Sequence, residues 1–155
     1  MTPEEYWLAE AVAEALRCTP IPTAYCVGSI IVAADGTELA RGYSRETDVS
    51  CHAEEVALAR AGADPRLAEA TLYASLEPCG VRRSRPVPCA RLIVASPLRR
   101  VVYALREPPT LAPGGGAEIL RAAGVTVLEL PDLAGGVRAA NPQLRAYPHP
   151  LADLG

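Results

Sequence analysis

Histidine and cysteine residues stand at three places in this sequence where their types suit a metal site. His52 lies in the run CHAEE (residues 51–55), Cys79 in the run EPC (residues 77–79), and Cys89 directly follows a proline. One histidine and two cysteines are a usual ligand set for a catalytic zinc ion, which keeps its fourth position for water. We therefore expect His52, Cys79 and Cys89 to bind Zn²⁺.

Glu54 is the candidate acid–base group beside this metal. It lies two residues after His52, and side chains on one helix face are three or four residues apart, so the two converge only if a helix begins at His52. Zinc lowers the pKa of water from ~15.7 towards ~7, and a carboxylate nearby can take the proton and pass it to a ring nitrogen or a leaving amine. That chemistry is hydrolytic deamination of an amino-substituted heterocycle. The adjacent Glu55 is expected to be a solvated helix residue.

The elements around the two cysteines must bring them to one point. Residues 71–76 form a predicted strand that ends just before Cys79, and Pro88 suits the first turn of a predicted helix over residues 88–95. Both thiolates would then lie at the carboxyl edge of a sheet, where open α/β folds place their sites. The positive end of the helix dipole also favours thiolate over thiol.

The remaining periodicities predict the architecture around this edge. Helical patterns cover residues 3–17, 52–60 and 117–123, while strand patterns cover residues 27–33, 38–43, 100–105 and 125–130, with a tight turn at Asp35-Gly36 joining the first two strands. We expect a three-layer α/β/α fold with a mixed, mostly parallel five-stranded sheet. One domain over residues 1–140 and a polar, proline-punctuated tail over residues 141–155 complete the prediction.

Composition narrows the class of partner. The chain has 155 residues, a formal net charge of −3, no phenylalanine and one tryptophan, which argues against a nucleic-acid surface and for a small molecule. No leader pattern or uninterrupted apolar span occurs, so we expect a cytoplasmic protein without membrane contact. Five cysteines, an odd number, do not suggest a disulfide framework. Cys18 and Cys26 are expected to be inert packing residues.

The motif resembles that of the cytidine-deaminase-like zinc superfamily, in which H-x-E is followed by P-C and a second cysteine, and the glutamate is an acid–base group rather than a ligand. The long gap between Cys79 and Cys89 looks like the deaminase domain of riboflavin-biosynthesis enzymes, and the likeness spans most of residues 1–130. It implies a homodimer or homotetramer. The riboflavin family usually has Pro-Asn-Pro before its first strand, a Ser-His pair after the first zinc cysteine and Asp-Pro-Asn-Pro after its fourth strand. This chain instead has TAY at residues 23–25, GV at 80–81 and REPP at 106–109.

Two loops are candidates for contacts with the substrate. Arg82, Arg83 and Arg85 lie between the two zinc cysteines, so the loop must leave the site and return, and its guanidinium groups could bind a phosphate. A solvated basic loop explains the same residues. Ala24 stands where the riboflavin family has its asparagine, and we place this position at the substrate as well.

Several alternatives stay open from the sequence. A non-catalytic zinc protein of the same fold would use Cys51 to close the coordination sphere, whereas an enzyme would keep that position open. Cys51 is otherwise a half-buried neighbour of the site. Within the enzyme class, the substrate could be a pyrimidine or purine base, nucleoside or nucleotide, or a secondary metabolite.

Overall fold

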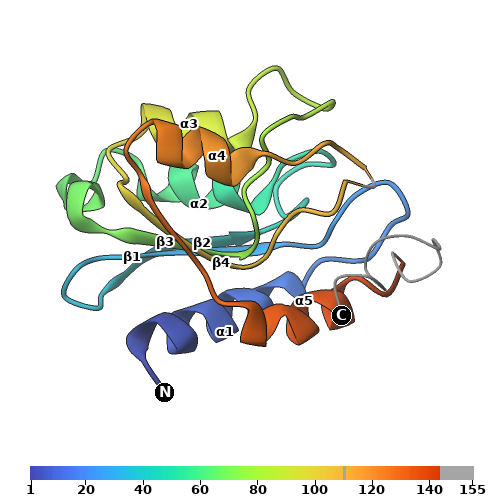
Figure 1. Ribbon diagram of the computed structural model, residues 1–155, viewed down its shortest axis with the longest axis horizontal. Helices are drawn as coiled ribbons and strands as arrows, with labels where there is room; N and C mark the ends of the chain where they lie inside the picture. The colour runs from blue at the N-terminus through green and yellow to red at the C-terminus, as the bar shows by residue number, and fades with distance from the viewer. Residues whose placement is uncertain (110, 144–155) are drawn as a thin grey trace.

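Five strands form one sheet that is covered by helices on both faces. The computed structural model describes residues 1–109 and 111–143. Figure 1 shows α2, α3 and α4 above the sheet and α1 and α5 below it. The strands are β1 (Gly28–Val32), β2 (Glu38–Tyr43), β3 (Thr71–Leu76), β4 (Arg100–Leu105) and β5 (Thr126–Glu129). The α-helices are α1 (Pro3–Ala15), α2 (Ala53–Ala61), α3 (Cys89–Ala95), α4 (Gly116–Ala122) and α5 (Ala134–Ala140).

The sheet has the order β2-β1-β3-β4-β5. β1 is antiparallel to both of its neighbours, β2 and β3, while β3, β4 and β5 pair in parallel. Four strands therefore run in one direction and only β1 runs in the other. The expected three-layer fold with a mixed, mostly parallel five-stranded sheet is confirmed.

The core is divided by the sheet into two apolar layers. One layer packs α1 and α5 on the sheet and includes Leu8, Ile30 and Val137. The other packs α2, α3 and α4 on the opposite face and includes Ile31, Ile93 and Leu120. Neighbouring residues of β1 thus contribute to opposite layers, as the alternation of side chains along a strand requires. No helix within the described residues is long and apolar enough to cross a membrane.

A close backbone contact fixes the start of α4 against the segment that follows β3. A Cβ atom on Gly116, the first residue of α4, would collide with the carbonyl oxygen of Pro78. Only glycine leaves room for this approach. The glycine-rich stretch at the start of α4 therefore packs closely against the backbone of residues 78–80, which includes Cys79.

The C-terminal part of the fold departs from the sequence-based expectation. α5 was not predicted, because its sequence AGGVRAA contains two glycines, which disfavour a helix. Packing outweighs this propensity: a Cβ atom on Gly136 would lie 2.5 Å from Cγ1 of Val12, so the glycine allows α5 to lie directly on α1. The tail expected from Asn141 falls mostly on residues 144–155, which are outside the described residues. Short 3-10 helices at Pro65–Glu69 and Pro131–Leu133 were also not predicted.

Candidate metal and substrate site

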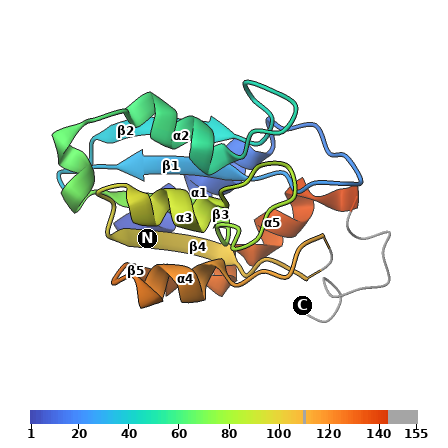
Figure 2. The same cartoon turned by 90° about the horizontal axis from the view of Figure 1, so that it is seen from above.

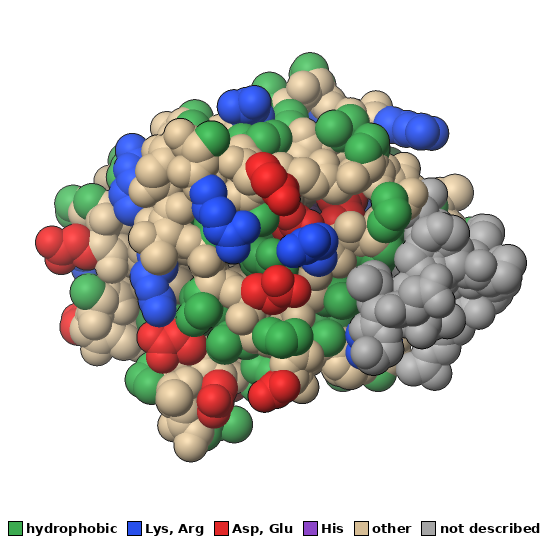
Figure 3. Space-filling model, in the orientation of Figure 1, with side chains coloured by type: hydrophobic (Ala, Val, Ile, Leu, Met, Phe, Trp, Pro, Cys, Tyr) green, Lys and Arg blue, Asp and Glu red, His purple; other side chains and the backbone are tan. Residues whose placement is uncertain are grey.

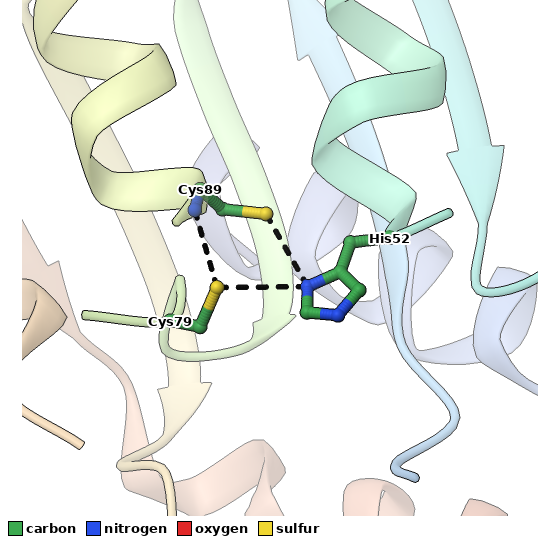
Figure 4. A group of neighbouring side chains, drawn as sticks. All are labelled: His52, Cys79 and Cys89. Atoms are coloured by element: carbon green, nitrogen blue, oxygen red, sulfur yellow. Dashed lines mark hydrogen bonds between the residues drawn. The ribbon is translucent and has the colours of Figure 1, made fainter. Parts of the chain in front are cut away.

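Three side chains from the ends of three elements meet at one edge of the sheet. His52 is the N-cap residue of α2, Cys79 lies three residues after β3, and Cys89 is the first residue of α3. Figure 4 shows the two sulfur atoms on one side of the imidazole ring. The Nδ1 atom of His52 is 3.5 Å from Sγ of Cys79 and 3.4 Å from Sγ of Cys89.

The geometry and chemistry of these donors fit a zinc ion. One ligand atom from each of the three residues lies within 4.8 Å of the others. Cys51 does not belong to this group; the Thr47 hydroxyl lies 3.4 Å from its sulfur atom and can donate a hydrogen bond to it. Among the described residues the cluster therefore has three protein donors, the number found in catalytic zinc sites.

The contact between the two cysteines favours a thiolate on Cys79. The Cys89 thiol lies beside Cys79, and its backbone N–H donates to Sγ of Cys79 at 3.1 Å. Hydrogen bonding from Cys89, and secondarily from His52, lowers the pKa of Cys79 to about 4. The same contact with Cys79 raises the pKa of Cys89. Thiolates are the form that binds metal, so the lowered pKa of Cys79 favours a cation at this point.

Glu54 lies in the first turn of α2 and is only 3% exposed. Its side chain lines the same cavity as His52 and Cys79. Burial raises the pKa of the Glu54 carboxyl above its usual range, because desolvation disfavours the charged form. The helix starts directly after His52, as the spacing of the two residues required.

A cavity of about 280 Å³ opens in front of the metal ligands. His52, Glu54 and Cys79 line one part of this cavity, and residues 23–25 form another part of its wall. Ala24, expected at the substrate from its position in the sequence, belongs to this wall. The volume of this cavity lies just below the usual range for small-molecule sites, about 300 to 1,000 Å³, and suits one heterocyclic ring.

The three arginines of the loop before α3 have different environments. The Arg82 side chain is 2% exposed, and its Nη2 atom donates to the Ser50 carbonyl at 2.6 Å and pairs with Glu55 at 2.5 Å. Arg85 pairs with Asp48 at 2.6 Å. Arg83 is exposed and lines the cavity, and no described residue pairs with it. Arg82 also lines the cavity, whereas Arg85 is not among its lining residues.

Glu55 is not the solvated helix residue that the sequence suggested. Its carboxylate accepts a hydrogen bond from the backbone N–H of His52 at 2.8 Å and pairs with Arg82. It also lies 3.5 Å from Nε of Arg85. The Glu55 side chain therefore caps α2, the helix that begins after His52, and anchors the loop of residues 80–88, which we call the arginine loop. Acidic and basic side chains are interspersed over the face of the molecule in Figure 3.

Two buried carboxylates near the site were missed from the sequence. Glu77 accepts hydrogen bonds from the backbone N–H groups of Glu107 at 2.9 Å and Ala117 at 2.8 Å, which joins the end of β3 to the segment after β4 and to the first turn of α4. Glu107 lines the cavity, burial raises its pKa to about 8, and its Oε2 atom has no hydrogen-bond partner among the described residues. The only available signal was an acidic residue at the carboxyl end of an apolar strand.

Known proteins resemble this chain in both sequence and structure. A family model of the cytidine and deoxycytidylate deaminase zinc-binding region matches residues 1–105. A diaminohydroxyphosphoribosylamino-pyrimidine deaminase of Schizosaccharomyces pombe is 38% identical over 129 residues, which are 81% of this chain and 31% of that protein. The riboflavin biosynthesis protein RibD of Aquifex aeolicus is 40% identical over 108 residues, 70% of this chain and 28% of that protein. This chain thus spans about a third of the length of these curated relatives.

Solved structures agree with the sequence matches. The RibD structure of Acinetobacter baumannii (form 2) has a TM-score of 0.78 with 31% identity and covers 93% of this chain and 40% of its own. The Rib2 deaminase of Aspergillus oryzae, in complex with DARIPP, has a TM-score of 0.72 with 22% identity over 94% of this chain and 97% of its own, which shows a shared fold. The matched zinc-binding region and the His52, Cys79 and Cys89 cluster confirm Zn²⁺ as the metal.

Proposed function

Because the chain belongs to the zinc-binding family of cytidine and deoxycytidylate deaminases, we propose that it hydrolyses an exocyclic amine of a pyrimidine to a carbonyl and releases ammonia. The observation that carries this proposal is the buried Glu54 carboxyl beside a cluster of three zinc donors at the base of a cavity. A buried carboxyl without a salt bridge is costly, and such groups concentrate at catalytic sites.

In this proposal His52, Cys79 and Cys89 hold the metal and Glu54 moves protons. When bound, zinc supplies a water nucleophile that is active near neutral pH. Glu54 would accept one proton from the attacking water and give it to the ring nitrogen next to the amine-bearing carbon. A second proton then passes through Glu54 to the leaving amine, which departs as ammonia. The raised pKa of Glu54 suits a group that must both accept and return a proton.

The walls of the cavity support a polar, phosphorylated substrate. Arg83 is the guanidinium at the cavity that has no partner among the described residues, so it can form charge-assisted hydrogen bonds to a phosphate at the mouth. Glu107 presents a carboxyl without a partner on Oε2, which can accept hydrogen bonds from amino groups of the ring. The compound in the name of the Schizosaccharomyces pombe relative, a diaminohydroxyphosphoribosylamino-pyrimidine, has both a phosphate and amino groups.

The positions of Cys51 and Arg83 argue against the remaining alternatives. A structural zinc site would need a fourth protein donor, and Cys51, the residue expected to supply it, lies outside the donor group. A free base or neutral secondary metabolite would leave Arg83 without a ligand. A homodimer or homotetramer stays a prediction, and light scattering on the zinc-loaded protein would read its mass.

The direct test is ammonia release from a panel of substrates. We expect the zinc-loaded protein to deaminate a diaminopyrimidine that carries ribose phosphate with a lower KM than the same compound without phosphate. Cytidine and deoxycytidylate serve as comparison substrates with a single exocyclic amine. If the zinc-loaded protein releases no ammonia from any member of the panel, the proposed activity is wrong. If the phosphate makes no difference to KM, the pyrimidine deaminase stands and its phosphorylated substrate does not.

A further inference from the structure

The segment between α1 and β1 begins and ends with a buried cysteine. Cys18 is 5% exposed and Cys26 is fully buried. Their sulfur atoms are 2.7 Å apart, which is within hydrogen-bond distance and close to the length of a covalent S–S bond, about 2.05 Å. Two thiols at opposite ends of one short segment are therefore already in contact, although the sequence suggested only two packing residues.

Arg45 holds this pair from the side. Its Nη2 atom lies 2.8 Å from Sγ of Cys18 and donates to the Thr19 carbonyl at 2.9 Å, while Nη1 donates to the Tyr25 carbonyl at 3.3 Å. The backbone of Arg45 has a φ of 60°, a left-handed conformation that is strained for a non-glycine residue. Such a conformation persists only where the surroundings hold it, and here Arg45 touches both ends of the segment.

The residues enclosed by this pair form a wall of the substrate cavity. Ile21, Thr23, Ala24 and Tyr25 all line the cavity, and Arg45 lines it as well. Within residues 18–26 the structure has one isolated bridge, between Ile21 and Ala24, and no helix or strand. The position of the wall therefore depends on side-chain contacts, among them those at its two ends.

We propose that Cys18 and Cys26 are a redox-active dithiol that a peroxide converts to a disulfide, and that this modification weakens substrate binding by shifting the cavity wall between them. The first half of this proposal stands on the contact between the sulfur atoms alone. The second half rests on the deaminase function proposed above.

The reaction uses the charge that Arg45 stabilises. A hydrogen bond from Cys18, with Arg45 nearby, lowers the pKa of Cys26 to about 7, and the pKa of Cys18 is raised because its proton serves that bond. The thiolate attacks one oxygen of hydrogen peroxide, and the O–O bond breaks to give a sulfenic acid and hydroxide, which becomes water. The second sulfur then attacks the sulfenic sulfur as its proton leaves with the departing hydroxide as water. Two thiols and one peroxide thus give one disulfide and two waters.

Disulfide formation removes the negative charge that Arg45 faces. The guanidinium then keeps only its hydrogen bonds to the Thr19 and Tyr25 carbonyls, while the new bond pulls the two ends of the segment together. Because Ala24 and Tyr25 move with that segment, the cavity wall changes position. The metal donors lie on other elements, so the change should appear in KM and leave zinc content unaltered.

Peptide mapping tests the first half without any assay of function. Cleavage after arginine releases residues 18–41 as one peptide that contains both cysteines and no other, and residues 46–60 as a peptide that contains Cys51 alone. After peroxide treatment of the zinc-loaded protein and alkylation, we expect the 18–41 peptide to carry no alkyl group and to have lost two hydrogen atoms. Cys18→Ser should block this product. A peptide that keeps two alkyl groups after Cys51 has been oxidised would overturn the dithiol.

Two further measurements test whether Arg45 promotes disulfide formation and whether the disulfide weakens substrate binding. Arg45→Gln should slow disulfide formation by roughly tenfold, because it removes the positive charge that favours the thiolate. In the wild type, peroxide should raise KM by about fivefold or more, with recovery on reduction and with zinc content unchanged. The Cys18→Ser variant should show no such response. A disulfide that forms without any change in KM would overturn the proposed effect on substrate binding. If the protein shows no deaminase activity, the mass of the 18–41 peptide still tests whether the disulfide forms.

Discussion

The cavity has two sides that are built by different means. On the metal side, His52, Glu54 and Cys89 stand at the first residues of α2 and α3, and Cys79 follows the end of β3. On the other side, residues 23–25 and the arginine loop belong to no regular element apart from one isolated bridge. Figure 2 shows α2 and α3 lying side by side over the sheet. The chemistry is thus fixed by element ends, while the space for the substrate is fixed by loops.

The loop side is held by long-range side-chain contacts instead of backbone ladders. The Tyr25 hydroxyl donates to the Pro108 carbonyl at 2.9 Å, and Arg45 donates to the carbonyl of Tyr25. Asn141 brackets the backbone of Cys26, accepting from its N–H at 2.6 Å and donating to its carbonyl at 3.0 Å. Each contact depends on a single side chain. Substitutions on this side should therefore shift affinity, whereas substitutions on the metal side should abolish turnover.

The largest expected effect comes from the metal side. Cys79→Ala should lose zinc and activity together, because two donors remain and the Sγ atom that accepts the N–H of Cys89 is gone. Metal analysis after gel filtration, run beside turnover, measures both. Cys51→Ala is the matched control, since Cys51 lies outside the donor group and should keep its zinc. Full zinc occupancy in Cys79→Ala would remove this residue from the ligand set.

The next effect separates proton transfer from metal binding. Glu54→Gln should keep zinc and fold while kcat falls by about 10²- to 10⁴-fold, since the amide cannot carry a proton. Glu55→Gln changes the adjacent carboxylate, which binds the His52 backbone and Arg82, so its loss should appear mainly as a lower melting temperature. Ordinary turnover by Glu54→Gln would exclude Glu54 from the mechanism.

The smallest effects distinguish two arginines of the same loop. Arg83→Ala should raise KM for a phosphorylated substrate by about tenfold and leave KM for its dephosphorylated form unchanged, with salt weakening the wild-type preference. Arg82→Gln should lower the free energy of unfolding by roughly 1 to 3 kcal/mol, because it leaves Glu55 and the Ser50 carbonyl without a buried donor. Equal KM values for both substrates in the wild type would assign Arg83 to solvent.

The sequence predicted the cluster of His52, Cys79 and Cys89 well because the patterns that indicate it lie close to these residues in the chain. Donor types in H-x-E and P-C patterns, together with strand and helix periodicity, were enough to place His52, Cys79 and Cys89 at one sheet edge. The resemblance to cytidine-deaminase-like zinc enzymes drawn from the same residues is confirmed.

On the other side of the cavity the sequence placed Ala24, Arg82 and Arg83, but the contacts that hold this side could not be predicted because they join distant residues. Arg82 pairs with Glu55, and Cys18 contacts Cys26, but periodicity does not relate the members of either pair. Periodicity also does not indicate that Glu107 is buried. α5 was missed for a related reason, since its glycines disfavour a helix until α1 is present to pack against.

The bracket that Asn141 places around Cys26 has a consequence for the order of assembly. These two residues are 115 positions apart in the chain, so their contact closes one of the longest loops in the fold, and such contacts form late because loop closure must come first. The proposed metal ligands span only residues 52 to 89 and can gather once α2, β3 and α3 have packed together. During synthesis on the ribosome, the metal side can therefore form before the wall of the cavity, which must wait until Asn141 has emerged.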